Sequence, residues 1–130
     1  MNMTLKTEYG TEKIQLEVST DYFTGGLSIG MNYKDNGEWM PYGDLTTTLP
    51  TRVPNYCAFV DTNNYPGAIE FVEKYQLGEK TEFEAKSGFC TYPRYLFNAE
   101  KLRKLCPEGM EEYERSIGVI KESPKNEKKR

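Results

Sequence analysis

The stretch LSIGMNYKDNGEW, residues 27–39, decides the fold of this 130-residue chain. Apolar residues recur at every second position from Leu27 to Tyr33, which is the period of a β-strand with one buried face. Asn36 and Gly37 then indicate a two-residue hairpin turn, because both central positions of such a turn need positive φ angles. The stretch therefore predicts an antiparallel hairpin.

The segments on both sides of this hairpin continue the strand pattern. Upstream, EKIQLEVS (residues 12–19) alternates apolar and polar residues and is joined to the hairpin by the glycine-containing loop at 21–26. Downstream, residues 39–49 form the expected return strand, which Pro50 ends. The first half is thus predicted to be a meander of three strands, or four if residues 4–9 also pair.

Helical patterns dominate the second half of the chain. The first predicted helix has an asparagine at 63–64 as its N-cap and Pro66 in its first turn, and it ends at Gly78. A second helix is expected after Asn98 as N-cap, and a short last helix over residues 107–118. We predict an α+β fold, an antiparallel sheet with an N-terminal meander packed on one side by two or three helices.

The segment SGFCTYPRYLF, residues 87–97, is apolar at both odd and even positions. This pattern favours a strand near the middle of the sheet or between sheet and helices, which ends, bulges or reaches an edge at Pro93. Cys90 is then expected to be a core thiol. The alternative is a reactive cysteine in an aromatic pocket, but Lys86 and Arg94 are four residues away on either side and the chain has no histidine to activate a thiol.

Length and charge predict one domain with a tail. We expect residues 1–118 to form a single α+β domain and residues 119–130 to form a disordered basic tail. From Lys121 to Arg130 there are five basic and two acidic residues, so the other 120 residues of this chain of net charge −3 carry −6. The tail is compatible with nucleic-acid binding, whereas the acidic body is not an obvious ligand for phosphates.

Composition restricts the chemistry. Without histidine, neither a Ser-His nor a Cys-His nucleophile can be assembled, and three dispersed cysteines make a poor zinc set. We therefore predict no enzymatic activity, no catalytic residues, no metal and no cofactor. No apolar run is long enough to span a membrane and the N-terminus does not resemble a secretory signal, so we expect a cytoplasmic protein without membrane contact.

Two acidic groups have ordinary explanations. Asp61, Asn63 and Asn64 lack the further ligands of a calcium loop, so helix capping is the favoured interpretation. The glutamates of the last predicted helix are interpreted as a solvated face, with a partner-facing acidic patch as the alternative. They are Glu108, Glu111, Glu112 and Glu114.

Aromatic residues are the strongest indication of a binding surface. The chain has 17 of them, ten of which are tyrosines, and tyrosine is enriched in protein interfaces. Most are expected to pack in the core or at its rim. The residues predicted to contact a partner interrupt loops or flank the hairpin: Tyr22, Phe23, Trp39, Met40 and Tyr42. Trp39 has the alternative of anchoring the core.

Three motifs in order, GLSIGMNYKDNGEWMPYGDLTTTLP, AFVDTNNYPGAIEFVEKYQLGE and SGFCTYPRYLFNAEKL, resemble a family catalogued as a domain of unknown function, number 4313. The resemblance implies a small protein of bacterial phages, plasmids and other mobile elements. It implies a non-catalytic binding protein, an inhibitor of a host defence nuclease of the anti-CRISPR kind, with a host protein as partner. The alternative function is an accessory nucleic-acid-binding protein of plasmid or phage replication, which uses the basic tail and an aromatic sheet face.

Overall fold

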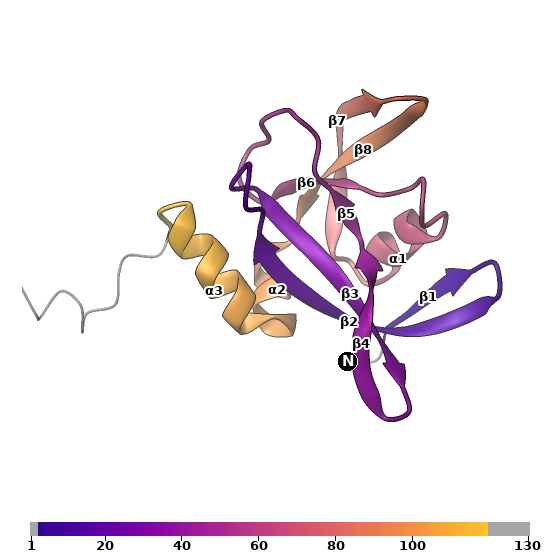
Figure 1. Ribbon diagram of the computed structural model, residues 1–130. Helices are drawn as coiled ribbons and strands as arrows, with labels where there is room; N and C mark the ends of the chain where they lie inside the picture. The colour runs from indigo at the N-terminus through magenta and orange to yellow at the C-terminus, as the bar shows by residue number, and fades with distance from the viewer. Residues whose placement is uncertain (1–2, 120–130) are drawn as a thin grey trace, which may run out of the picture.

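The chain begins as a β-meander in the computed structural model, which describes residues 3–119 (Figure 1). Strands β1 (Met3–Thr7), β2 (Gly10–Thr20), β3 (Leu27–Asp35) and β4 (Glu38–Asp44) are antiparallel neighbours in that order. Asn36 and Gly37 have φ angles of 52° and 84° in the turn between β3 and β4, as the sequence predicts. The meander is therefore confirmed, with its fourth strand.

The remaining strands form a second antiparallel sheet, which the sequence does not predict. It contains β5 (Thr46–Thr47), β6 (Cys57–Val60), β7 (Gly78–Ser87) and β8 (Cys90–Phe97), in the order β5-β6-β8-β7. The α+β class is confirmed. β8 lies between β6 and β7, as expected of a strand with apolar residues on both faces.

The chain passes from one sheet to the other at Leu45. The N–H of Leu45 donates to the carbonyl of Ile29 at 2.8 Å, and the carbonyl of Leu45 accepts from the N–H of Asp61 at 2.9 Å. Leu45 thus bonds to β3 of the first sheet and to the residue that follows β6 of the second. The predicted return strand over residues 39–49 is wrong, because it splits here into β4 and β5.

Two helices follow β8. α2 (Ala99–Leu105) begins after Asn98, whose side chain accepts from the backbone N–H of Lys101, so this predicted cap is confirmed. α3 (Pro107–Ser116) begins at a proline, whose missing N–H is tolerated in a first helical turn. α3 packs against β2, and α2 packs against α3 (Figure 1).

The helix α1 (Ala68–Lys74) begins and ends elsewhere than predicted. Its N-cap is Gly67, with no side-chain hydrogen bond, so neither asparagine at 63–64 caps it. A Cβ atom on Gly67 would lie 2.5 Å from the carbonyl oxygen of Lys6, so β1 requires glycine there. After the helix, Gln76 rather than Gly78 takes the left-handed conformation, with φ 54°.

One core connects both sheets and all three helices. Inward-facing residues of the meander pack against the apolar faces of the helices and of β6 and β8. No helix within residues 3–119 is both long and apolar enough to cross a membrane. The largest fully buried side chains include Tyr95, Tyr113, Phe71, Leu5, Ile14, Ile29, Met31, Leu45, Leu77, Leu102 and Met110.

Cys90 is not a core thiol. It is half-buried at the start of β8, opposite Ser87, in the part of β8 that pairs with β7 alone. Pairing with β6 covers only residues 94–96 of β8, so Pro93 marks the point where the strand gains a free edge. The prediction for Pro93 is confirmed, and it is the reason that Cys90 lies outside the core. The predicted tail, apart from Val119, lies outside the described residues.

Candidate functional site

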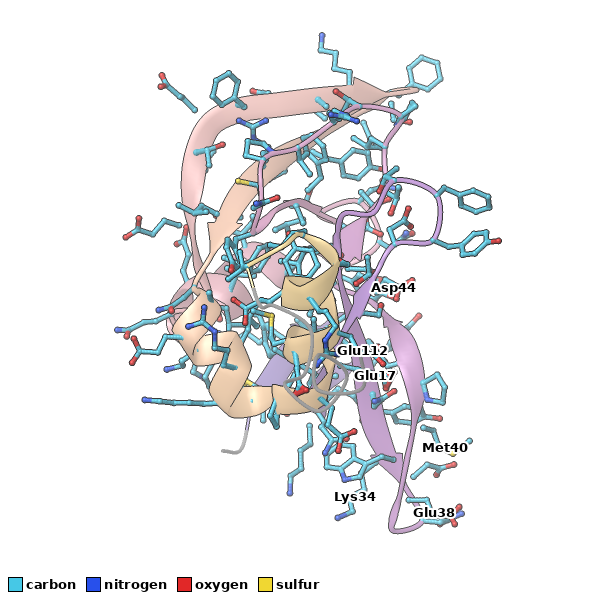
Figure 2. The ribbon with its side chains drawn as sticks, turned by 90° about the vertical axis from the view of Figure 1, so that its left-hand side faces the viewer. Glu17, Lys34, Glu38, Met40, Asp44 and Glu112 are labelled. Atoms are coloured by element: carbon cyan, nitrogen blue, oxygen red, sulfur yellow. The ribbon has the colours of Figure 1, made fainter. Side chains whose placement is uncertain are left out.

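The five residues predicted to bind a partner lie in two places. Tyr22 and Phe23 are in the loop between β2 and β3, whereas Trp39, Met40 and Tyr42 are on β4. Trp39 pairs with Lys34, seven residues along β3 from the loop end at Leu27, which is about 23 Å at the usual rise of a strand. Tyr42 lies nearer the loop, next to the pair of Gly43 with Met31. Figure 2 shows Met40 and the neighbouring Glu38 at the lower end of the meander, away from the loop. The five residues therefore do not form one patch.

Asp21 organises the loop that carries Tyr22 and Phe23. Its Oδ2 accepts from the N–H groups of Thr24 at 2.7 Å and Phe23 at 3.0 Å, and from the Thr24 hydroxyl at 2.9 Å. Its Oδ1 accepts from the Thr48 hydroxyl at 3.1 Å. These donors, the N–H of Thr24 first among them, lower the pKa of Asp21. The loop is therefore fixed internally and bonded to the residue that follows β5.

Tyr22 and Phe23 project from this fixed loop into solvent. Their exposed fractions are 91% and 88%, and their rings meet edge to face with centroids 5.2 Å apart. The loop backbone closes through the Asp21 N–H, which donates to the Gly26 carbonyl at 2.7 Å. The hydrogen bonds of the loop thus keep two large aromatic side chains exposed to solvent.

A groove of about 420 Å³ lies between this loop and the segment that joins β5 to β6. Phe23, Val53, Pro54 and Tyr113 contribute apolar surface to it. Of the described residues that line the groove, Arg52 alone is charged. The exposed aromatic pair therefore borders a partly apolar groove with one positive charge, and we call the two together the loop–groove surface.

A partly buried network links the end of the β5–β6 segment to α2 and α3. The Tyr56 N–H donates to the Tyr113 hydroxyl at 2.9 Å, and the Tyr56 hydroxyl donates to Glu114 Oε2 at 2.5 Å. Arg103 binds Glu114 with two hydrogen bonds, of 2.8 Å and 2.6 Å. The two Arg103 bonds and the Tyr56 hydroxyl lower the pKa of Glu114. Tyr56 has a φ of 67° and is the last residue of the β5–β6 segment, so its two hydrogen bonds join the end of this segment to α3.

Glu114 differs from the other glutamates of α3. Its exposed fraction is 1%, whereas Glu108, Glu111 and Glu112 are exposed. The interpretation of all four as one solvated face is therefore wrong for Glu114. Its burial is tolerated because Arg103 and Tyr56 satisfy the carboxylate.

Tyr42 belongs to an internal cluster of tyrosines. Its ring centroid is 5.7 Å from that of Tyr33 and 5.8 Å from that of Tyr65. A Cβ atom on Gly43 would lie within 1.7 Å of the Tyr65 hydroxyl, so this packing requires glycine. Burial raises the pKa of both Tyr42 and Tyr65. The Tyr42 ring therefore contributes mainly to packing.

Trp39 and Met40 are partly exposed, at 37% and 41%. The Lys34 Nζ lies 5.3 Å from the centroid of the Trp39 ring, within range of a cation–π interaction. Trp39 also lines a groove of about 210 Å³ together with Lys13 and Lys104. The tryptophan is consequently surrounded by lysines and does not anchor the core.

The hydrogen bond between Tyr95 and Glu73 serves the fold. Glu73 lines a groove of about 710 Å³ between α1 and the second sheet, and it accepts from the buried Tyr95 hydroxyl at 2.9 Å. Burial, followed by Glu73, raises the pKa of Tyr95 to about 12, so the tyrosine keeps its proton and links α1 to β8. Within residues 3–119, no three His, Cys, Asp or Glu side chains are grouped so as to hold a metal ion.

Sequence reasoning did not identify Arg52 or the β5–β6 segment as part of a surface. The signal that was available is the pair Pro50 and Pro54, which encloses Arg52 and keeps the segment out of a sheet. The position of Arg52 beside Phe23 could not be inferred, because it depends on the passage of the chain at Leu45.

The fold and the site define a small α+β protein with two antiparallel sheets and an exposed aromatic pair beside a groove. The chain belongs to the family described as "Domain of unknown function (DUF4313)", whose sequence model matches residues 15–117. That range extends from the middle of β2 to the end of α3. Neither a curated protein nor a solved structure matches the chain.

Proposed function

We propose that this protein is a non-catalytic binding protein whose partner is another protein, and that the loop–groove surface contacts it. The observation that carries the proposal is the pair Tyr22 and Phe23, exposed at 91% and 88% on a loop fixed by Asp21. Isolated apolar residues on a surface are ordinary, but two adjacent aromatic rings on a rigid loop favour recognition.

The energetics of the pair suit a binding hot spot. An aromatic side chain buries about 150–250 Å² when it is covered, and aromatic residues contribute disproportionately to interfaces. Much of the cost of binding lies in ordering loops and side chains. The hydrogen bonds of Asp21 meet part of that cost before the partner arrives.

The partner that we propose is a nuclease of a host defence system. The resemblance to small proteins of phages and mobile elements supports a host partner, and blocking a nuclease requires binding but no catalysis. The absence of histidine from the sequence favours a mechanism without acid-base chemistry near neutral pH. The defence nuclease is thus inhibited by a surface that covers part of it.

The experiment combines phage challenge with direct binding. Bacteria that carry one defined defence nuclease are challenged with phage, with and without this protein, and the nuclease is tested for co-purification. We expect protection of the phage and a complex of the two proteins. The Tyr22→Ser/Phe23→Ser variant should lose both effects while keeping its melting temperature.

The matched control is Tyr9→Ser/Phe89→Ser. It removes two equally exposed aromatic residues from other turns of the fold, where the exposed fractions are 95% and 109%. This control should protect the phage as well as the unchanged protein does. If no defence nuclease is inhibited, or if the loop variant and the control behave alike, the proposal fails.

A further inference from the structure

The groove beside Trp39 has a composition unlike the rest of this acidic chain. It lies where β1 begins, beside the middle of β2 and the corner between α2 and α3, and its volume is about 210 Å³. Lys13 and Lys104 line it with Trp39, and none of the described residues that line it carries a carboxylate. Lys34, at the lower end of β3 in Figure 2, adds a third positive charge over the Trp39 ring.

The three lysines have few opposing charges. Among the described residues, Lys13 and Lys34 form no salt bridge, and Lys104 has only the exposed Glu100 at 3.8 Å. An exposed pair of this kind contributes little, so Lys104 can exchange its partner. Asp35 and Glu38 form the pair next to Lys34 and Trp39, so the alternation along each strand directs their side chains to the other face.

Two of the lysines lie just beyond the end of the β2–β3 ladder. Ile14 and Tyr33 form its last pair, and Lys13 and Lys34 each come one residue further along, where the alternation of both strands directs them to the same face. Like charges at neighbouring cross-strand positions reduce stability. An anion bound between them would remove this repulsion, which points to a ligand and not to packing.

The combination of an indole face with surrounding ammonium groups fits one class of ligand. Bases of single-stranded nucleic acids stack on aromatic side chains, and lysines neutralise the adjoining phosphates. The groove accommodates a single base but not a duplex, which would need a longer row of phosphate contacts than the acidic body provides.

We propose that Trp39, Lys13, Lys34 and Lys104 bind one nucleotide unit of a single-stranded nucleic acid. The base lies against the indole and the flanking phosphates lie between the lysines. This site is separate from the loop–groove surface and gives particular residues of the folded body to nucleic-acid binding, whereas the sequence-based alternative named only the basic tail and an aromatic sheet face. It goes beyond the proposed function and does not depend on it.

The chain provides its own reporter, because Trp39 is the only tryptophan. The full-length protein is titrated with a ten-residue thymidine oligonucleotide in 20 mM salt while tryptophan fluorescence is recorded. We expect saturable quenching, and an affinity that falls with salt with a logarithmic slope of about −1.4, as neutralisation of the two flanking phosphates on a single strand implies. The Tyr22→Ser/Phe23→Ser variant should give the same curve, so failure of the proposed function leaves this test intact.

Charge variants separate a local site from general electrostatics. Lys13→Glu/Lys34→Glu should weaken binding at least tenfold, whereas Lys80→Glu/Lys86→Glu, with the same net charge on β7, should change it less than twofold. Trp39→Ala should also weaken binding at least tenfold, measured with a labelled oligonucleotide. Circular dichroism melting identifies any variant that unfolds, and Trp39→Leu, which keeps an apolar side chain but has no aromatic face, then replaces Trp39→Ala with the same expected loss.

Several results would overturn the proposal. The first is an absence of tryptophan quenching. The second is an equal loss of affinity for the oligonucleotide in Lys13→Glu/Lys34→Glu and Lys80→Glu/Lys86→Glu. The third is unchanged affinity in Lys13→Glu/Lys34→Glu, which would assign the binding to the tail. Thymidine monophosphate binding as tightly as the oligonucleotide would indicate a free nucleotide. Equal binding of a duplex or of a polyglutamate peptide would remove the single strand as the ligand.

Discussion

Two strands of this protein, β2 and β8, have no neighbouring strand along part of one edge, and the two unpaired edges differ in what covers them. β2 pairs with β1 only as far as Ile14, and its remaining edge is covered by α3. β8 pairs with β6 only from Arg94 onward, and its earlier residues form a two-stranded arm with β7 that extends beyond the second sheet (Figure 1). One edge is built into the core, whereas the other is left to solvent.

The covered edge depends on close contact. The Cys106 thiol donates to the Leu16 carbonyl at 3.2 Å, and Gly109 lies directly over the Val18 carbonyl. Leu16 and Val18 are buried there. Carbonyl groups that a strand would have bonded are thus enclosed by a helix, which is one way in which proteins protect a sheet edge.

The open arm uses a different protection. None of the residues from 81 to 94 is buried, and charged residues alternate along β7. Pro93 removes one N–H from the ladder at the point where β6 ends. Charges and proline discourage pairing with another chain without adding to the core. The comparison predicts that stability depends on the covered edge and hardly on the arm.

The largest effect is expected for Gly109→Ala. The added Cβ atom would lie 2.1 Å from the Val18 carbonyl oxygen, a backbone atom that cannot rotate away. A clash of this kind costs about 3 kcal/mol, and the better helix propensity of alanine returns about 1 kcal/mol. We expect a net loss of about 2 kcal/mol in the free energy of unfolding, measured by urea denaturation.

Gly30→Ala is the matched control. Gly30 lies on the outer face of β3, where a Cβ atom would meet nothing closer than the Asp44 carboxylate at 3.4 Å. Alanine should leave stability unchanged or raise it by about 0.5 kcal/mol, because it restricts the unfolded chain. Equal stability of the two variants would show that α3 does not lie tightly on β2.

The next effect is expected for Glu114→Gln, which removes the charge that Arg103 and Tyr56 bind beneath the loop–groove surface. Arg103 is half-exposed and can be hydrated, so the loss is below that of a fully buried pair. We expect about 1.5 kcal/mol at neutral pH, as is usual for hydrogen bonds to a charged group. Chemical denaturation at pH 7 measures it.

The same residue has a pH signature. The pKa of Glu114 in the folded protein lies below its ordinary 4.5, so its contribution is complete above pH 4.5 and is lost as the pH falls through the folded value. The stability difference between the unchanged protein and Glu114→Gln should therefore shrink below pH 4.5. Glu111→Gln breaks only an exposed pair with Arg115, so its free energy of unfolding should differ from that of the unchanged protein by less than about 0.5 kcal/mol. A difference for Glu114→Gln that stays constant with pH would contradict this account.

A smaller effect is expected in the arm. Phe89 is fully exposed at its tip, so Phe89→Ser should change the free energy of unfolding by less than about 0.5 kcal/mol. Amide hydrogens at residues 84–91 should exchange about tenfold or more faster than those of β3, because the arm has no buried contacts. A clear loss of stability, or protection of the arm comparable to that of β3, would show that it is part of the core.

The covered edge and the open arm also show what sequence can predict. Local chemistry was sufficient for the meander, for the Asn36 turn, for the Asn98 cap and for the end of full pairing at Pro93. Each depends on residues that are close in sequence. The alternating pattern is local in the same way and contains no signal for the passage between sheets at Leu45, so it predicted one strand where the structure has β4 and β5.

The failures depend on contacts between distant residues. The second sheet requires Leu45 to bond to Ile29 and Asp61, and the start of α1 requires Gly67 to approach Lys6. The exposure of Tyr22 and Phe23 was predictable from a glycine loop, but the groove beside them was not. Glu114 was assigned to a solvated face because its partner Arg103 lies on another helix.

The last prediction uses the three cysteines to compare the two regions without changing either. Cys106 is buried under the covered edge and Cys57 is buried in β6, and burial raises the pKa of both thiols. Cys90 is half-buried on the open arm. Because thiolate formation and solvent access control alkylation, iodoacetamide at pH 8 should modify Cys90 first in the native protein. We expect one modified thiol per native chain, and three in denaturant.

Cys90→Ser should remove the fast reaction and change the free energy of unfolding by less than about 0.5 kcal/mol. Fast modification of Cys106 in the native protein would mean that α3 leaves β2 readily, and the contrast between a covered and an open edge would then be wrong.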